Sequence, residues 1–378
     1  MRLTVARLAF KAALERVAPL AANKTYIPIL KNVLLEAHDG ALLMRCSNQE
    51  ITIRTQVPCE VHRSGEFTVP ARLLLDVVNS AAGDIEMSLD NVTLHVTSGR
   101  SKWKLMGLSA KDYPGMPYVS EGSTFKMPLV VLRQVIQQAV FACATDATRP
   151  SLVGIHFAGM SQDPHMEVTS TDTHRITLRT IELDEPADVK FVLPRETAAV
   201  IMRTFDGDGE ISVTVNGSRG IELEEGVTLV HSALVDSSGF PNARRVIPTN
   251  FTADFRIERK TFSDILRRVS LVLSGENEKV VLVIVDEHAI TLMSNSENAG
   301  VAEETVDHLG GTGIASWCFQ VAYLQEMLTA LDSEILRVQG STTLIPVLIT
   351  GDNQDYLYLQ APCSIPKWVQ AETLKQAA

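Results

Sequence analysis

The stretch from Phe125 to Ala142 reads FKMPLVVLRQVIQQAVFA, a short extended segment followed by apolar residues at helical spacing. The apolar positions recur at steps of three, three, one, three and one, which is the stripe of an amphipathic helix with one buried face. They are Leu129, Leu132, Val135, Ile136, Ala139 and Val140. The stretch therefore predicts a strand that leads directly into a surface helix.

Two further stretches are built in the same way, LTVARLAFKAALERVAPL from Leu3 and FRIERKTFSDILRRVSLV from Phe255. A second helical pattern follows each of the three at a similar distance. These patterns are TVPARLLLDVVNSA from Thr68, VLPRETAAVIMRTF from Val192 and FQVAYLQEMLTAL from Phe319. Internal repetition on this scale predicts three tandem domains, called here repeat one, repeat two and repeat three.

Each repeat also contains short runs of β-branched and alternating residues bounded by turn residues, which are typical of antiparallel strands. The runs lie at 29–36, 41–46, 50–58, 67–69, 85–89, 92–97 and 102–108 in repeat one, at 152–158, 166–170, 175–183, 211–216, 221–225 and 228–234 in repeat two, and at 280–285, 289–294, 334–339, 343–350 and 356–359 in repeat three. Two linkers, 113–124 and 236–250, are rich in Pro, Gly and Ser and lack periodicity.

These patterns predict an α+β fold in which each domain packs two helices on antiparallel sheets. The expected domain bounds are 1–121, 125–248 and 251–378, the last with a C-terminal extension.

Composition excludes several other classes of protein. The chain has 378 residues with 45% apolar and 21% charged residues, which is ordinary for globular domains. It contains no secretory signal pattern and no apolar run near the roughly 18 residues of a membrane span. Five cysteines at unrelated spacings form neither a disulfide framework nor a metal-binding pattern. We therefore expect a reduced, cytoplasmic protein with no cofactor, no metal and no membrane partner.

The distribution of charge points to a polyanionic partner. The formal net charge is −11, yet the stretches 1–20, 125–142 and 255–273 together carry +8, which leaves −19 on the rest of the chain. A solvated face explains a basic bias on any single helix. The same bias on three equivalent helices predicts a shared surface for a polyanion such as DNA.

Several local strings, in order along the threefold repeat, resemble the bacterial DNA polymerase III beta subunit, the replicative sliding clamp. They are IPILKNVLL from Ile27, TVPAR from Thr68, SGRSKWKL from Ser98, TDTHRI from Thr171 and LVDSSGFPNARRVIP from Leu234. The resemblance covers Met1 to about Leu359. It implies a head-to-tail homodimer that closes into a ring, with helices lining the hole around duplex DNA and sheets outside. A ring that contacts phosphates slides without reading bases.

The resemblance also implies a groove that binds short linear peptides of the polymerase III alpha subunit, the clamp loader and repair polymerases. Extended peptides bind such grooves through a few apolar anchors and backbone hydrogen bonds. The matching positions are Leu152, Thr171, Thr173, His174, Arg175, Ile176, Pro241, Arg245, Val246, Tyr323, Leu344, Pro346, Leu357 and Leu359.

Two more sets of residues follow from the helices and from the resemblance. The residues expected near DNA are Arg7, Lys11, Lys24, Arg133, Arg195, Arg203, Arg267 and Arg268. The residues expected at the dimer interface are Arg100, Lys102, Lys104, Tyr113, Val272, Leu273, Glu297, Glu303 and Glu304.

Alternatives remain at this point. Val272 and Leu273 could be ordinary core residues, and Thr171 to Ile176 could be a turn in which His174 satisfies backbone groups. An enzyme would use Asp172 and His174 as an acid and base pair, but no nucleophile motif accompanies them. Gly311-Thr312-Gly313 is too short for a dinucleotide fingerprint. A third possibility is a clamp paralogue for repair or plasmid replication.

The segment after the last strand departs from the family pattern. The stretch LYLQAP, from Leu357, stands where the family has a tail of Met and Pro, and the chain continues to Ala378. Gln360 and Ala361 are expected to make this wall of the groove more polar. The extension, with Trp368 and Leu374, is expected either to lie near the groove or to hang free.

Overall fold

A computed structural model describes residues 1–21, 26–116, 122–146, 148–217, 220–273, 279–341, 345–352, 355–364 and 368. The chain divides into two compact units. Unit 1 comprises Met1–Arg133 and Leu183–Val235, and unit 2 comprises Gln134–Glu182 and Asp236–Ala378. Each unit therefore contains the junction between two successive repeats.

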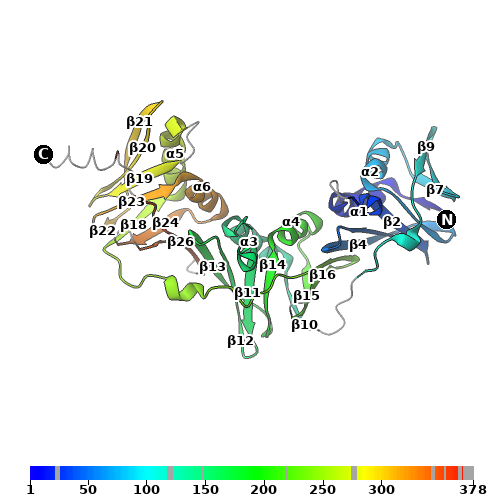
Figure 1. The fold of residues 1–378 in the computed structure, drawn as a ribbon, viewed down its shortest axis with the longest axis horizontal. Helices are drawn as coiled ribbons and strands as arrows, with labels where there is room; N and C mark the ends of the chain where they lie inside the picture. Colours follow the sequence, from blue (N-terminus) through cyan, green and yellow to red (C-terminus); the bar gives the residue numbers. More distant parts are fainter. Residues whose placement is uncertain are drawn as a thin grey trace. The chain divides into compact units, whose positions relative to one another are not determined.

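The six predicted helices are confirmed, and each follows a strand with at most one residue between them (Figure 1). They are α1 (Arg7–Val17), α2 (Ala71–Ser80), α3 (Leu129–Ala139), α4 (Arg195–Thr204), α5 (Arg259–Val269) and α6 (Val321–Ala330). The apolar stripe of α3 is buried as its spacing predicts, from Leu129 to Ala139. Val140 already belongs to the following 3-10 helix, η4 (Val140–Ala142), and is only half-buried.

Unit 1 contains two antiparallel sheets. The first has the order β5-β1-β7-β8-β9, and the second has the order β10-β15-β16-β17-β4-β3-β2-β6. Their strands are β1 (Arg2–Val5), β2 (Asn32–His38), β3 (Ala41–Ser47), β4 (Ile51–Pro58), β5 (Glu60–Arg63), β6 (Gly65–Pro70), β7 (Ile85–Asp90), β8 (Thr93–Ser98), β9 (Ser101–Met106), β10 (Ser123–Pro128), β15 (Glu210–Asn216), β16 (Gly220–Glu225) and β17 (Thr228–Ser232). β14 (Lys190–Pro194) leads into α4. The pairing of β17 with β4 joins repeat two to repeat one in one continuous sheet.

Unit 2 repeats this plan. One sheet contains the order β11-β12-β13-β26-β25-β24-β18-β22, and a four-stranded sheet has the order β21-β20-β19-β23. Their strands are β11 (Gly154–Met160), β12 (Asp163–Thr171), β13 (Arg175–Glu182), β18 (Ala253–Glu258), β19 (Val280–Val285), β20 (Ala289–Ser296), β21 (Gly300–Asp307), β22 (Gly311–Thr312), β23 (Ala315–Gln320), β24 (Ile335–Gly340), β25 (Val347–Thr350) and β26 (Tyr356–Gln360). The pairing of β13 with β26 joins repeat two to repeat three.

The core of repeat three shows how the two layers fit together. Phe262 and Leu266 of α5 and Leu324 of α6 pack against Trp317 and Tyr358, which point inward from the two sheets. Figure 1 shows α5 and α6 beside these strands in unit 2. The opposite faces of the sheets are therefore available for other contacts.

The structure corrects the predicted strands at several points. Residues 28–31 and 150–152 form 3-10 helices, η2 and η5, where strands were expected to begin at Ile29 and Leu152. A proline at the first position of each fixes φ and removes the N–H that a strand would use. β5 was missed, and β21 was read as a polar stretch because its alternating side chains are at most half-buried.

Candidate functional site

The segment Thr171–Arg175 forms the turn between β12 and β13 in unit 2. Asp172 accepts backbone hydrogen bonds from the N–H groups of His174 and Arg175 through Oδ1, each at 3.0 Å. Thr171 accepts one from the N–H of Thr173, at 3.1 Å, and Thr173 has a φ of 80°. The segment is therefore a turn, as one interpretation of the sequence held, but Asp172 rather than His174 satisfies the backbone.

Arg175 is buried and bonded on every side within unit 2. Its guanidinium donates to Asp172 Oδ2 at 3.0 Å, to Glu326 Oε2 at 2.5 Å and to the carbonyl of Phe141 at 2.5 Å. It also lies over the ring of Tyr323, 4.1 Å from the centroid. Burial lowers the pKa of Arg175, but the hydrogen bond to Glu326 and the nearby anionic groups outweigh it and raise the pKa overall. Arg175 therefore ties the turn to α6, with its donors already used inside the chain.

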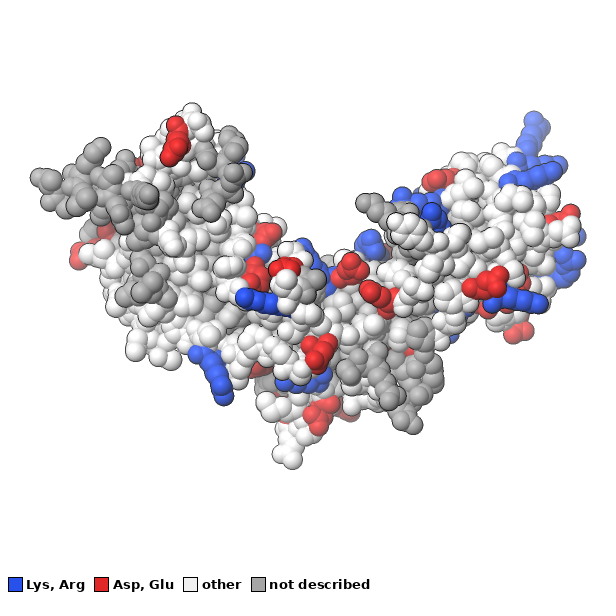
Figure 2. Space-filling view, in the orientation of Figure 1, with Lys and Arg blue, Asp and Glu red and all other residues white. Residues whose placement is uncertain are grey.

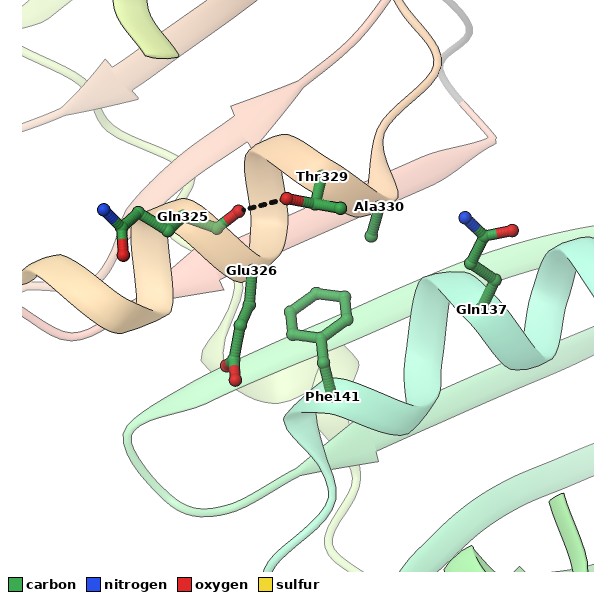
Figure 3. Close-up of a pocket in the computed structure, with 6 residues that line it drawn as sticks. All are labelled: Gln137, Phe141, Gln325, Glu326, Thr329 and Ala330. Carbon is green, nitrogen blue, oxygen red and sulfur yellow. Dashed lines mark hydrogen bonds between the residues drawn. The ribbon is translucent and has the colours of Figure 1, made fainter. Parts of the chain in front are cut away.

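A pocket of about 290 Å³ lies next to this arginine, between η4 and α6 (Figure 3). Phe141 points toward α6, and the side chain of Glu326 lies beside its ring. The remaining lining residues are Gln137, Gln325, Thr329 and Ala330. Because Phe141 and Glu326 also hold Arg175, the pocket and the turn share one set of contacts.

His174 is exposed in this turn, as is Thr173. Its ring is stacked near that of Tyr323, with centroids 6.3 Å apart and an interplanar angle of 27°. Burial, followed by the neighbouring Asp172 carboxylate, raises the pKa of the Tyr323 hydroxyl. The backbone carbonyl of His174 accepts a hydrogen bond from the N–H of Ala361 at 2.8 Å. This bond holds the first residue after β26 beside the turn.

The other face of the same sheet carries an apolar strip. Cross-strand partners share a face, and the pairs Ile176 with Leu359, Leu359 with Leu348, and Leu178 with Leu357 place five side chains together. A cavity of about 450 Å³ opens on this face, bounded by Leu348 and Leu357. Its other lining residues are Arg256, Ile335, Arg337, Gln339, Thr350, Gly351 and Asp352. Sequence reasoning missed Leu178, Leu348 and the cavity arginines, which the register alone reveals.

The predicted groove residues are thus divided between two faces. Arg175 and Ile176 are successive residues of β13, so their side chains point to opposite sides of the sheet. Ile176 and Leu359 belong to the apolar strip, and Arg175 with Tyr323 belongs to the helix side. Gln360 is fully buried and accepts from the Tyr358 hydroxyl at 3.0 Å, so the expectation that it makes the wall of the groove more polar is wrong.

The remaining predicted groove residues that the structure describes lie in η5, on the second linker and just before β25. Leu152 is buried at the end of η5. On the linker, the ring of Phe240 stacks on that of His156, with centroids 4.5 Å apart. An ion pair between Arg244 and Glu167 anchors the linker further along. Pro241, Arg245 and Val246 are exposed on this linker, Pro346 is half-buried, and Leu344 lies outside the described residues.

Three arginines, one on the first helix of each repeat, bind the ends of the second helices; Arg7 and Arg259 begin their helices, whereas Arg133 lies one turn into α3. Arg7 donates to the carbonyls of Val78 and Asn79 at the end of α2. Arg133 donates to the carbonyls of Met202 and Phe205 at the end of α4. Arg259 does the same for α6, at the carbonyls of Leu328 and Ser333. These cations satisfy carbonyls that a helix leaves unpaired, so Arg7 and Arg133, expected near DNA, act as helix caps.

The other residues expected near DNA differ in whether their side chains are paired with a carboxylate and in how exposed they are. Lys11 pairs with Glu15 at 3.6 Å, and Arg267 lies 3.9 Å from Asp264. Arg268 donates from Nε and Nη2 to the two carboxylate oxygens of Glu304, which ties a predicted DNA residue to a predicted interface residue. Arg203 is exposed on α4, and Arg195 is half-buried. Lys24 lies outside the described residues.

The predicted interface residues lie on β9, β21 and the segments next to them. Arg100, Lys102, Lys104, Glu297 and Glu303 are exposed. In Figure 2, Lys and Arg side chains gather at the end of unit 1 that carries β9.

The apolar residues predicted for the interface are more buried than expected. Tyr113 is 6% exposed, and its hydroxyl donates to the carbonyls of Asn32 and Arg45. Leu273 is 1% exposed and belongs to the core of repeat three, whereas Val272 is only partly buried there. Leu271, which sequence reasoning missed, is 67% exposed.

Within the described residues, no cluster of His, Cys, Asp and Glu could hold a metal ion. No helix in that same part of the chain is long and apolar enough to span a membrane.

The threefold arrangement of paired helices on sheets that run across repeat junctions defines the DNA clamp class of proteins. Three family models match the chain in succession: the N-terminal domain of the DNA polymerase III beta subunit over residues 1–117, the central domain over 126–242 and the C-terminal domain over 244–363. The chain therefore belongs to the DNA polymerase III beta subunit family, the bacterial sliding clamps.

Named relatives agree with this assignment. The beta sliding clamp of Staphylococcus aureus is 25% identical over 368 residues, and that of Bacillus subtilis is 26% identical over 371; each alignment covers 94% of this chain and 97% of the relative. Among solved structures, the Bacillus subtilis sliding clamp has a TM-score of 0.92 at 24% identity, covering 97% of this chain and all of that one. The Pseudomonas aeruginosa clamp bound to griselimycin has a TM-score of 0.90 at 26% identity, with the same coverage.

Proposed function

We propose that two copies of this chain close head to tail into a ring around duplex DNA and tether the replicative polymerase for processive synthesis. The ring acts without sequence specificity, in the cytoplasm where the chromosome is copied. It docks the polymerase III alpha subunit, the clamp loader and repair polymerases through short peptides. Its domains are those expected at 1–121, 125–248 and 251–378.

One observation carries the ring. A repeat joins its neighbour by pairing an edge strand of each, β17 with β4 and β13 with β26. The equivalent edges left over are β9 in repeat one and β21 in repeat three, each with a neighbour on one side only among the described residues. Unpaired edges invite strand addition. A third junction of the same kind, made between two copies, uses both edges and closes the ring.

The register of this junction follows from the two that exist. The hairpins β16–β17 and β8–β9 both have two-residue loops. Leu229 and Lys102 are each the second residue after the loop, so they are equivalent. Ser170 donates to the carbonyl of Ala139, the last residue of α3, and Ser294 donates to that of Val269, the last residue of α5, so the two serines are equivalent. Their cross-strand partners are Thr177 and Ala302. The next residues along these strands, Leu178 and Glu303, are therefore equivalent as well. In the two existing junctions, Leu178 of β13 pairs with Leu357 of β26, and Arg54 of β4 pairs with Leu229 of β17. Lys102 of one copy therefore lies opposite Glu303 of the other.

A charge swap tests this register. Lys102→Glu and Glu303→Lys each place like charges opposite one another, which destabilises a sheet, and each variant should sediment with a larger monomer fraction. The double variant restores an attractive pair and should return toward the dimer, twice 41.4 kDa. Failure of the double variant to recover would refute the register. Wild-type chain that sediments only as a monomer would refute the ring.

Retention on DNA tests the encircling itself. A closed ring should stay on a circular duplex at high salt and slide off once the circle is linearised, because topology rather than phosphate contacts holds it. Each phosphate contact steepens the salt dependence by roughly 0.9 in log–log slope, so few tight contacts suit sliding. Equal retention on circular and linear DNA would argue for ordinary binding. Arg203→Glu should shorten retention, since its side chain is exposed on α4.

The apolar strip with its cavity is the proposed peptide site. Burying one Leu or Phe side chain stabilises a complex by roughly 1.5 to 3 kcal/mol, whereas micromolar affinity needs about 8 kcal/mol. Two or three anchors on Ile176, Leu357 and Leu359, with backbone contacts, therefore give weak and exchangeable binding. Griselimycin bound to the Pseudomonas aeruginosa clamp shows that a related clamp takes a ligand.

Leu357→Asp tests the peptide site because Leu357 is half-buried at the cavity. We expect it to weaken a fluorescently labelled clamp-binding peptide at least tenfold while the chain stays dimeric. Met160→Asp is the control, since Met160 is 65% exposed at the end of β11 and belongs neither to the strip nor to the proposed dimer edges. Equal affinity of wild type and Leu357→Asp would place the site elsewhere.

The proposed role is noncatalytic. Asp172 has a structural role, because both of its carboxylate oxygens accept hydrogen bonds that hold the turn and Arg175. Retained stimulation of the cognate polymerase by His174→Ala supports tethering, and a turnover that this variant abolishes would support an enzyme. The relatives named above carry no reference to repair or plasmids. Stimulation of the main replicase separates the two clamp roles.

A further inference from the structure

The outer face of the four-stranded sheet in unit 2 carries a buried apolar row. Met293, Leu282 and Cys318 are cross-strand partners on β20, β19 and β23, and they are 5%, 4% and 0% exposed. Trp317 and Phe319, on either side of Cys318, point into the core. Cys318 therefore faces outward and is covered from outside.

The C-terminal extension supplies that cover. Trp368 packs against Leu282 and Met293, with Ile284 beside them. Nearer the last strand, the N–H of Cys363 donates to the carbonyl of Cys318 at 2.7 Å. Cys363 thus lies at the edge of β23, and Trp368 lies on the apolar row. The family match itself ends at residue 363.

This hydrogen bond places the two cysteines within disulfide range. Standard bond lengths on either side of a 2.7 Å hydrogen bond limit the separation of the two Cα atoms to about 6.9 Å. Disulfides require Cα atoms less than about 7 Å apart. Cys318 and Cys363 both carry thiols in the structure.

We propose that Cys318 and Cys363 form an oxidation site, at which a peroxide joins the two thiols in an intramolecular disulfide that fastens the C-terminal extension to β23. The Cys363 sulfur attacks the peroxide oxygen, which gives a sulfenic acid and one water from hydrogen peroxide. The Cys318 sulfur then attacks the sulfenic sulfur and displaces its oxygen, which leaves as a second water with the Cys318 proton. Two thiols lose two electrons and two protons, and the peroxide is reduced.

Exposure sets the order of these steps. Cys363 is half-exposed, so peroxide reaches it first. Burial, with the nearby Cys363 thiol, raises the pKa of Cys318 to about 12, which keeps Cys318 protonated and unreactive until the sulfenic acid forms beside it. The bond would connect the strand that leads into α6 with the segment that follows β26. This inference is independent of the clamp function.

Peptide mapping tests the proposal. The full chain is treated with stoichiometric hydrogen peroxide, alkylated, digested without reduction and analysed by mass spectrometry. We expect one linked pair of peptides containing Cys318 and Cys363, lighter by two hydrogen atoms and separated by a thiol reductant. Cys59→Ser is the matched control, because Cys59 is also half-exposed, and it should leave the link intact. Cys363→Ser should abolish the link.

One result would overturn the proposal: Cys363 recovered as sulfinic acid, or in a link between two chains, while Cys318 is alkylated. Cys318→Ala gives a second variant in which the link cannot form. The link should also raise the unfolding temperature of oxidised wild type, because it restrains the unfolded chain, and oxidised Cys363→Ser should show no such rise.

Discussion

Repeat one turns from β3 to β4 at Asn48, and repeat two turns from β12 to β13 at Asp172. In both turns the side-chain Oδ1 accepts hydrogen bonds from two backbone N–H groups. In repeat one the donors are Glu50 and Ile51, at 3.1 and 2.7 Å. In repeat two they are His174 and Arg175, each at 3.0 Å. The residue after the cap has a φ of 82° in Gln49 and 80° in Thr173.

The two turns differ in the residue three positions after the cap. Repeat one places Ile51 there, which is 2% exposed, and repeat two places Arg175, which is 6% exposed. Asn48 is neutral, whereas Asp172 offers a second oxygen to the guanidinium. The backbone motif is therefore a common scaffold, and one buried charge converts it into an anchor for α6. The comparison predicts that the charge in repeat two can be removed only together with its partners.

Arg175→Ile imposes the repeat-one residue on repeat two and should have the largest effect. Removing the cation leaves the Asp172 carboxylate, 13% exposed, and the Phe141 carbonyl without their donor. Breaking a buried pair from one side costs about 3 to 5 kcal/mol. We expect that loss in the free energy of unfolding of unit 2, measured by urea denaturation.

The double variant Asp172→Asn with Arg175→Ile completes the repeat-one pattern and provides the control. Asn keeps the Oδ1 contacts to the backbone and removes the stranded charge, so we expect it to recover about 1 to 2 kcal/mol of the loss. A double variant that is no more stable than Arg175→Ile alone would show that the charge of Asp172 is not the cause.

The sequence predicts the helices and the repeat because both depend on local periodicity. The stripe from Leu129 to Ala139 needs only the 3.6-residue period, and its burial follows once any sheet covers it. The three starting points at Leu3, Phe125 and Phe255 make the domain count visible without any contact information.

Partners of individual side chains could not be predicted in this way. Arg7 and Arg133 fit a basic inner face by composition, yet their donors reach helix ends about 70 residues further along the chain. The alternation of side chains along a strand, which sends Arg175 and Ile176 to opposite faces, is a local property. Their partners, Glu326 and Leu359 respectively, come from repeat three. Such pairings depend on register across a junction, which composition does not encode.

Arg133→Met tests the helix-cap interpretation, which is the next largest effect. Arg133 is half-buried and donates to two carbonyls at the end of α4. Hydrogen bonds from a charged donor contribute roughly 1.5 to 3 kcal/mol, and Met keeps the apolar stem. We expect unit 1 to lose about 2 kcal/mol, and Arg7→Met to lose less, since one of its contacts is exposed.

Salt dependence of DNA retention separates the two roles of these arginines. Arg133→Met should leave the log–log slope unchanged, and Arg203→Met should reduce it, because Arg203 is exposed on α4. If Arg133→Met changes the slope as much as Arg203→Met without loss of stability, Arg133 is a DNA contact and not a cap.

Thr173→Gly should stabilise the repeat-two turn. A β-branched residue at a φ of 80° is strained, and glycine relieves this strain at the cost of greater freedom in the unfolded chain. We expect a net gain of about 0.5 to 1 kcal/mol. Gln49→Gly in repeat one should gain less, because Gln is unbranched. The urea midpoints of the two units give both values, and a loss in Thr173→Gly would mean that the threonine side chain makes a necessary contact.

Asp254→Asn measures an exposed pair against the buried one and should have the smallest effect. The hydrogen bond from Arg337, the largest cause, lowers the pKa of Asp254 in the folded chain. The pair therefore stabilises the fold above the unfolded pKa of about 3.9, and this contribution is lost as the pH falls through the lower folded value. The side chains are 31% and 41% exposed, so about 0.5 kcal/mol is expected at pH 7. The gap between wild type and Asp254→Asn should shrink as the pH falls below about 3.9 and close once the pH is below the lowered pKa of the folded state; a gap that persists there would assign it to packing.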